Sequence, residues 1–350
     1  TFDPAAAGTG GEITYSVSNT PWTAISAGAD HNLALKGDGT LWGWGYNGYE
    51  VLGNGTDVDS NVPVQAGTDT DWAAVSAGEY HSLGVKTNGT LWAWGYDDYG
   101  EAGGSSSAIP VQIGTDTDWA KVEGGSYRSF GIKTNGTLWA WGYNGGVFGD
   151  GSSDDSDTPV QIGTDANWAS VSTFSEGNHV LGVRTDGTLW AWGYNYYGEL
   201  GNGTFNGSNV PVQIGAATDW AKAKAGAYHS LAIKTDGTLY AWGYNTSGEL
   251  GIGNEDDSNV PVLVGTGWAD ISSGYYASLG IKTDGTLWGW GYNYYGQSGN
   301  GTSDDSNVPV QAGTATNWSQ IEASDGFAVG LQSDGNLWAW GYNGDGYLGD

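Results

Sequence analysis

Four histidines are the side chains in this sequence best suited to metal binding or proton transfer, and all occupy one local context. Imidazole is a common metal ligand and a general acid or base near neutral pH. Either chemistry requires the side chains to converge, whereas equivalent positions of a repeat are spread around a ring. We therefore expect hydrogen bonds within or between repeats. The histidines are His31, His81, His179 and His229, and other repeats place Arg128, Ala277 and Phe327 there.

Short acidic loops offer a second kind of chemistry, because calcium takes several oxygen ligands from such segments. The spacing of the acids differs between repeats and lacks the glycine and terminal acid of a complete calcium loop. Asx turns and solubility explain the same residues equally well. Calcium is therefore one alternative, with no other cofactor expected. The candidate ligands are Asp154, Asp155, Asp157, Asp256, Asp257, Asp304 and Asp305.

Asn-x-Ser/Thr sequons mark candidate glycosylation sites. Asn88 and Asn135 stand where other repeats use aspartate before glycine, which indicates turn residues. The remaining loop sequons are the sites expected to carry glycan if the host glycosylates proteins. They begin at Asn54, Asn202, Asn206, Asn245 and Asn300.

Tyrosines gather where the repeats differ most, directly after each Trp-Gly-Tyr-Asn segment. A variable loop tip can carry binding specificity without disturbing the scaffold. Tyrosine suits recognition of proteins or sugars because it combines rigid apolar area with a polar hydroxyl. A structural role for these tips is an equal alternative. The candidate binding residues are Tyr49, Tyr99, Tyr196, Tyr197, Tyr294 and Tyr295.

The composition argues against several functional classes. There is no cysteine, no Ser-His-Asp set outside repeat positions and no phosphate loop, so we expect no enzyme activity. The 39 acidic and 10 basic side chains give a formal charge of −29, which repels nucleic acid. No run of about 18 apolar residues predicts a membrane span. Without cysteine the fold takes nothing from disulfides, and the missing initiator methionine predicts a processed protein, extracellular or at the cell surface.

A unit of roughly fifty residues, which is typical of repeat arrays and propellers, positions all of these side chains. In the second copy, residues 72–77, 82–87, 91–96 and 62–66 are predicted strands, rich in β-branched or aromatic residues. The pair Asn88-Gly89 predicts a type I′ hairpin turn between the second and third strands. Its Trp-x-Trp-Gly-Tyr segment recurs, once with tyrosine first, from Trp42, Trp92, Trp139, Trp190, Tyr240, Trp288 and Trp338.

Seven such copies predict an all-β chain, a seven-bladed β-propeller of four-stranded antiparallel blades. The seventh copy ends at Asp350 before its Pro-Val strand. We therefore expect an N-terminal strand at residues 13–17, which alternate Ile-Thr-Tyr-Ser-Val, to close the last blade. Residues 1–10 are expected to be a flexible arm, and residues 11–350 a single propeller domain.

Several repeated motifs resemble those of the regulator of chromosome condensation family. They are Gly-x-Tyr-His-Ser-Leu, the Asp-Gly hairpin, Leu-Trp-x-Trp-Gly and Gly-Glu-Leu-Gly followed by Pro-Val. The resemblance covers nearly the whole chain and implies a seven-bladed propeller. The family includes a nuclear nucleotide-exchange factor, signalling scaffolds and a secreted bacterial β-lactamase inhibitor, so fold alone does not assign function. This chain has no exchange-factor wedge or basic tail, and its composition is closest to the secreted bacterial members.

The expected function is therefore protein–protein interaction or structural assembly by a secreted or cell-surface propeller, with a filament or surface-layer subunit as one form. One alternative is a carbohydrate- or receptor-binding module on a virion or cell surface. Another is a secreted enzyme inhibitor. The expected partner is a protein or a second copy of the chain, with glycan as a further option.

Overall fold

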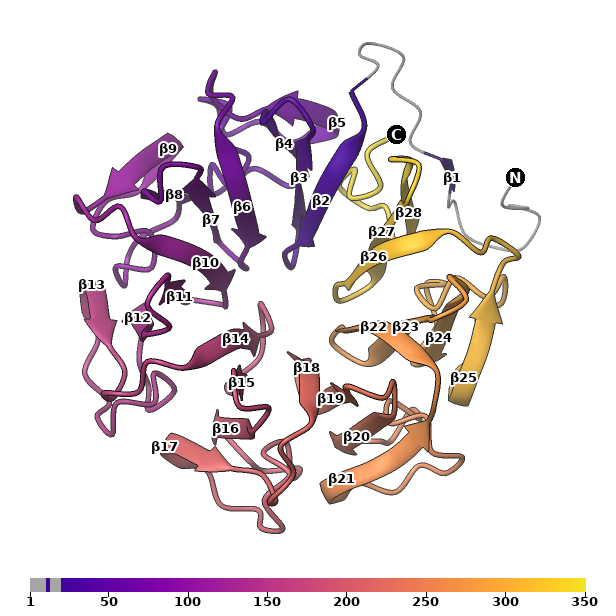
Figure 1. Ribbon diagram of the computed structural model, residues 1–350. Coiled ribbons are helices and arrows are strands. Elements are labelled where there is room, and N and C mark those ends of the chain that lie inside the picture. The colour runs from indigo at the N-terminus through magenta and orange to yellow at the C-terminus, as the bar shows by residue number, and fades with distance from the viewer. Residues whose placement is uncertain (1–10, 13–19) are drawn as a thin grey trace.

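The computed structural model describes residues 11–12 and 20–350. These residues form seven four-stranded antiparallel sheets, arranged as blades around a central axis (Figure 1). The predicted all-β, seven-bladed propeller is thereby confirmed. Within the described part of the chain, no helix is long and apolar enough to cross a membrane.

In the first six blades the strands run outward from the axis in chain order (Figure 1). The first blade contains β2 (Trp22–Ala27), β3 (His31–Lys36), β4 (Leu41–Gly45) and β5 (Ser60–Gln65). The second contains β6 (Trp72–Ala77), β7 (His81–Lys86), β8 (Leu91–Gly95) and β9 (Ser107–Ile113), and the third contains β10 (Trp119–Gly124), β11 (Arg128–Lys133), β12 (Leu138–Gly142) and β13 (Ser156–Gln161). The fourth contains β14 (Trp168–Thr173), β15 (His179–Arg184), β16 (Leu189–Gly193) and β17 (Ser208–Gln213). The fifth contains β18 (Trp220–Ala225), β19 (His229–Lys234), β20 (Leu239–Gly243) and β21 (Ser258–Gly265). The sixth contains β22 (Trp268–Ser273), β23 (Ala277–Lys282), β24 (Leu287–Gly291) and β25 (Ser306–Ala312). The seventh contains β26 (Trp318–Ala323), β27 (Phe327–Gln332), β28 (Leu337–Gly341) and β1 (Gly11–Glu12).

The seventh blade contains strands from both ends of the chain. In β1, Gly11 pairs with Ala339 and Glu12 pairs with Trp338 of β28, so β1 occupies the outermost position of that blade. The predicted closing strand at residues 13–17 and the predicted arm at residues 1–10 lie outside the described residues.

The turn between the second and third strands differs from the predicted type I′ turn. Gly89 has a φ of 79°, but Asn88 is not among the described non-glycine residues with positive φ. The Gly89 N–H donates to the Lys86 carbonyl, and the Lys86 N–H donates to the Thr90 carbonyl. This is a three-residue loop in which only the glycine needs the left-handed region. The Asn88 side chain accepts from the Thr90 N–H at 3.0 Å, which holds the turn without a second positive φ.

Tryptophans at the third strands fill the space between neighbouring blades. Trp94 is fully buried and packs with Leu33, Leu35 and Leu41 of the preceding blade. Its indole N–H donates to the Val51 carbonyl, also in the preceding blade, at 2.6 Å. The corresponding indoles of the other six blades make the same kind of bond. Second and third strands are buried on both sheet faces because each blade packs against two others.

The histidines confirm the expected structural role and link blades in pairs. His229 Nε2 lies 2.8 Å from the Ser278 hydroxyl of the next blade, and that hydroxyl donates to the Glu249 carbonyl. The serine hydroxyl donates its own hydrogen to that carbonyl, so it must accept from the histidine. Nε2 is therefore protonated and donates a hydrogen bond to the serine oxygen. His31, His81 and His179 make equivalent contacts with Ser82, Ser129 and Ser230.

Candidate functional site

The strands nearest the axis place one residue from every blade in a ring. In four blades this residue is a serine whose hydroxyl accepts from the next blade, as Ala77 N–H donates to Ser26 at 2.9 Å and Ala323 N–H donates to Ser272 at 2.9 Å. Three blades place a charged residue there instead. In chain order the ring is Ser26, Ser76, Glu123, Ser172, Lys224, Ser272 and Glu322.

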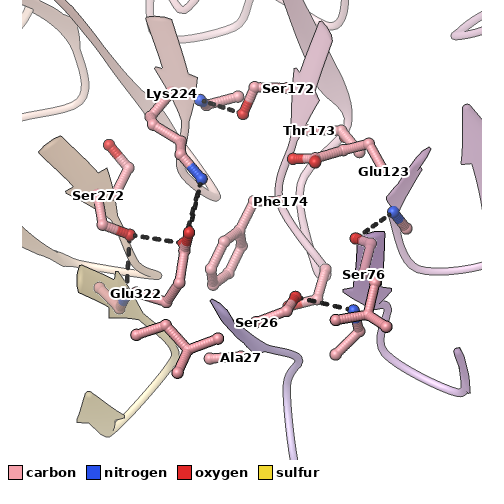
Figure 2. A pocket seen from close by; sticks show the side chains of 18 residues that line it. Ser26, Ala27, Ser76, Glu123, Ser172, Thr173, Phe174, Lys224, Ser272 and Glu322 are labelled. Atoms are coloured by element: carbon pink, nitrogen blue, oxygen red, sulfur yellow. Dashed lines mark hydrogen bonds and ion pairs between the residues drawn. The ribbon is translucent and has the colours of Figure 1, made fainter. Parts of the chain in front are cut away.

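Two of the charged residues pair on one side of the axis. Lys224 Nζ lies 3.1 Å from both carboxylate oxygens of Glu322 (Figure 2), two blades further along the chain. The Ser272 hydroxyl of the intervening blade donates to the same carboxylate at 3.2 Å. Burial opposes the charged form of Lys224, but Glu322 and Glu123 outweigh it and raise the pKa of Lys224 above its usual value.

Glu123 has no such direct partner among the ion pairs of the described residues. Burial raises the pKa of its carboxyl to about 7, although Lys224 acts in the opposite direction. All three charged residues line a polar cavity of about 100 Å³ along the axis. The arrangement can bind a small polar or charged group.

Sequence reasoning missed this ring because each member follows its strand's tryptophan inside a segment that looks purely structural. A usable signal existed: the fifth residue of the first strand is serine in four copies and charged in three. Only the closed ring shows that these positions, which are at least 47 residues apart in sequence, face one cavity.

Replacing Lys224 with methionine should lower the free energy of unfolding by about 1–3 kcal/mol, because two carboxylates then share the cavity without a cation. The expected loss is moderate because the Lys224 and Glu322 side chains are 30 % and 27 % exposed. The triple variant Glu123→Ser/Lys224→Ser/Glu322→Ser restores serine at every position and should be close to the parent. Urea denaturation measures both. A triple variant as unstable as Lys224→Met would contradict the charge argument.

A tyrosine-rich face covers one end of this cavity. In an antiparallel blade the loop between strands one and two and the loop between strands three and four lie at the same end. Both carry tyrosines in most blades, and we call this end the tyrosine face and the opposite end the hairpin face. Tyr49 lies in the loop between the third and fourth strands of the first blade. Its ring contacts that of Tyr80 in the next blade, with ring centroids 4.8 Å apart. Tyr197 likewise contacts Tyr228 at 5.7 Å.

Acidic side chains gather where the innermost strands end on the tyrosine face, and we call this cluster the acidic entrance. Asp30, Glu79, Glu176 and Asp325 all belong to loops between first and second strands. Burial raises the pKa of Glu176 to about 8, and the charges of the other three add to the shift, so the four carboxyls influence one another. None of the ion pairs in the described part of the chain includes them. Burial raises the pKa of Glu79 and the buried Arg128 guanidinium opposes that shift, so the entrance is an acidic site with one cation nearby.

The predicted binding tyrosines are all on the tyrosine face, and their rings are held in place by other tyrosines. The exposed fractions are 77 % for Tyr196 and 66 % for Tyr294, large enough for contact with a partner. Tyr49, Tyr99, Tyr197 and Tyr295 are about 40 % exposed and pack edge-on against neighbouring rings. Recognition of a partner by these six residues stays a prediction.

The acidic loops have a structural role that accounts for part of the calcium hypothesis. Asp155, Asp257 and Asp305 accept from the backbone N–H of Asn144, Asn245 and Asn293 at 2.8 Å. Within residues 11–12 and 20–350, no group of three or more His, Asp or Glu side chains could hold a metal ion. The proposed calcium ligands Asp154, Asp155, Asp157, Asp256, Asp257, Asp304 and Asp305 therefore do not converge as such a site requires.

One predicted glycosylation site is wrong. Asn245 is fully buried, and its amide nitrogen donates to the Asn254 and Asp256 carbonyls at 3.0 Å. A glycan there would break both bonds and has no space in the fold. Asn54, Asn202 and Asn300 are half-buried and Asn206 is exposed, so glycosylation of these four stays a prediction.

The strand-end cations likewise have an architectural role on the hairpin face. Lys86 Nζ lies 4.1 Å from the Trp92 ring centroid and 5.1 Å from that of Trp72. It also pairs with Asp71 at 3.3 Å. Such cation–π contacts occur again at Lys36, Lys133, Arg184, Lys234 and Lys282, one in each of the first six blades. These residues therefore do not form a free basic patch.

Comparison with solved structures finds the same fold in proteins of low sequence identity. Human WBSCR16 superimposes with a TM-score of 0.80 and 21 % identity, over 93 % of this chain and 87 % of that one. Prp20p from Saccharomyces cerevisiae gives a TM-score of 0.74 and 19 % identity, over 91 % and 82 % of the two chains. At these identities the likeness concerns the fold alone.

Sequence comparisons identify the family. The ultraviolet-B receptor UVR8 of Arabidopsis thaliana is 43 % identical over 49 residues, which are 14 % of this chain and 11 % of the receptor. The family model of the RCC1-like domain matches residues 8–267. Models of the regulator of chromosome condensation (RCC1) repeat match residues 268–297, 318–346 and 284–331. Because the first of these models covers more than half of the sequence, the chain belongs to the RCC1-like family of repeat propellers.

Proposed function

We propose that this propeller is a non-enzymatic binding protein that holds a protein partner on its tyrosine face. The observation that carries the proposal is the ordered set of partly exposed tyrosine rings around an acidic entrance. Tyrosine is enriched at interfaces because its ring loses little conformational entropy on binding and its hydroxyl tolerates water. The rings here contact one another before any partner arrives, which lowers that entropy cost further.

The opposite face offers less for a partner to bind. Its cations contact tryptophan rings, and several also pair with aspartates. Relatives support a binding role in general terms. One structure of yeast Prp20p is described with its binding to Gsp1p and histones, and another shows Kap60 bound to the same protein.

Site-specific photo-crosslinking tests the proposed face. A photoreactive amino acid replaces Tyr196 or Tyr294 on the tyrosine face, and exposed Thr70 or Thr218 on the hairpin face serves as the matched control. Irradiation in extract or medium from the source cells should give protein adducts from the two tyrosine positions. With the identified partner, Tyr196→Ser/Tyr294→Ser should weaken binding by roughly tenfold or more. Adducts formed mainly from Thr70 and Thr218 would overturn the proposal.

We also propose an extracellular or cell-surface location, supported by the strongly acidic composition. Self-assembly and glycan recognition are narrower forms of the same binding role. A second copy of the chain among the adducts would favour assembly, and glycosidase-sensitive adducts would favour glycan recognition.

A further inference from the structure

We propose that the axial cavity beneath the tyrosine face binds a primary ammonium group, supplied by a lysine side chain of the partner. The inference rests on the proposed function for the source of the ammonium, because the partner must dock on this face. The cavity itself can be tested without the partner. Its chemistry follows from three observations: unpartnered hydroxyls, the charge balance and the acidic entrance.

Two buried hydroxyls in the cavity lack partners. Ser175 and Ser273 are each 4 % exposed, and neither hydroxyl has a hydrogen-bond partner in the structure. Both residues line the axial cavity of about 100 Å³. Buried polar atoms are almost always satisfied by protein, water or ligand. These two hydroxyls are therefore available to a group that occupies the cavity.

The charges of the cavity favour a cation. The carboxylate of Glu322 is paired with Lys224, but Glu123 has no direct cation partner. The Glu123 carboxylate lies beside Thr173 on the other side of the cavity (Figure 2). An ammonium has three N–H donors and no acceptor, and the residues that line the cavity offer acceptors in the Glu123 carboxylate and in the Ser175 and Ser273 hydroxyls. Above pH 7, where Glu123 is ionised, an anion would meet two carboxylates and one ammonium that is already paired.

The entrance selects the same sign of charge and a slender side chain. Glu176 directly follows Ser175, which lines the cavity, so the acidic entrance adjoins the cavity. Its other carboxylates, Asp30, Glu79 and Asp325, raise the local concentration of cations. A lysine carries a compact charge on a flexible four-carbon stem, whereas the guanidinium of arginine is broad and planar. The volume of roughly three water molecules suits the former.

The test uses the full chain and n-butylammonium, which reproduces the end of a lysine side chain. Isothermal titration at low salt should show saturable binding at one site, and a crystal soaked with the compound should show its nitrogen beside Glu123. Glu123→Ser, which installs the residue found in four other blades, should weaken binding at least tenfold. Glu255→Gln removes the same charge from an exposed loop and should leave binding unchanged.

Neutral n-butanol and the diamine putrescine separate the remaining explanations. Binding of n-butanol as tight as that of n-butylammonium, or an unchanged affinity in Glu123→Ser, would overturn the proposal. Putrescine binding a hundredfold tighter than n-butylammonium would identify a free diamine as the ligand and overturn the assignment to a partner lysine. Failure of n-butylammonium to bind, with crosslinking from Tyr196 intact, would reject the cavity site and leave the proposed function standing.

Discussion

Trp94→Ala should lower the free energy of unfolding by about 3–5 kcal/mol, the usual cost of deleting a buried large aromatic side chain. The indole is fully buried between the first and second blades, among leucines of the first. The backbone packs closely against the indole: a Cβ added to Gly53, which has a φ of 68°, would lie only 2.9 Å from the indole nitrogen. Removal of the indole leaves a cavity in this closely packed region. The surrounding backbone therefore cannot collapse easily to fill the space.

Trp92→Ala is the matched control, because it removes the same side chain two residues earlier on the same strand. Trp92 is only half-buried, and its indole N–H donates locally to the Thr90 hydroxyl. It should cost clearly less than Trp94→Ala in urea or guanidinium denaturation. A Trp92→Ala loss equal to or larger than that of Trp94→Ala would show that the interface between blades is not where the stability resides.

His229→Ala should change the pH dependence of stability by about 3 kcal/mol between pH 7 and pH 4. Burial lowers the pKa of His229 from 6.5 to about 3. Below pH 6.5 the unfolded chain therefore binds a proton at this residue that the folded chain does not. The contribution of neutral His229 is complete above pH 6.5, and it is lost progressively as the pH falls toward 3.

The structural reason is the unused nitrogen of the ring. Nε2 donates to Ser278, while Nδ1 is buried without a partner and faces the backbone at Gly226. A proton on Nδ1 would place a charge where nothing accepts it. Alanine is accommodated at this position, because Ala277 occupies it in the sixth blade. The parent should thus be more stable than His229→Ala at pH 7, with the difference shrinking or reversing by pH 4.

Denaturation curves at several pH values provide the measurement, and His229→Gln is the control that keeps a donor but does not titrate. Buried Glu101 and Glu249, whose pKa values are raised to about 7, act in the opposite direction on the parent curve. Comparing parent with variant removes their shared contribution. Parallel curves for the parent and both variants would contradict a neutral, proton-excluding His229.

Much of the blade could be predicted from the sequence because its determinants are local. The tryptophan spacing, the glycine of the hairpin and the apolar second and third strands act within about twenty residues of one another, as strand and turn signals usually do. The turn type was wrong because Asn88 stabilises a three-residue loop through its side chain, which needs one positive φ rather than two. Burial of Asn245 was missed because its partners, Asn254 and Asp256, fold back from the far end of its loop.

The sequence by itself determined the repeat, the all-β class, the number of blades and the family, because the residues of each copy have the same local preferences for strands and turns. Only the tertiary structure decided that Glu123, Lys224 and Glu322 share one cavity, and that the tyrosines of separate loops form one face. Those contacts join residues from different blades. Their distances depend on how many blades close the ring and on which end of each blade a loop lies, neither of which any single repeat encodes.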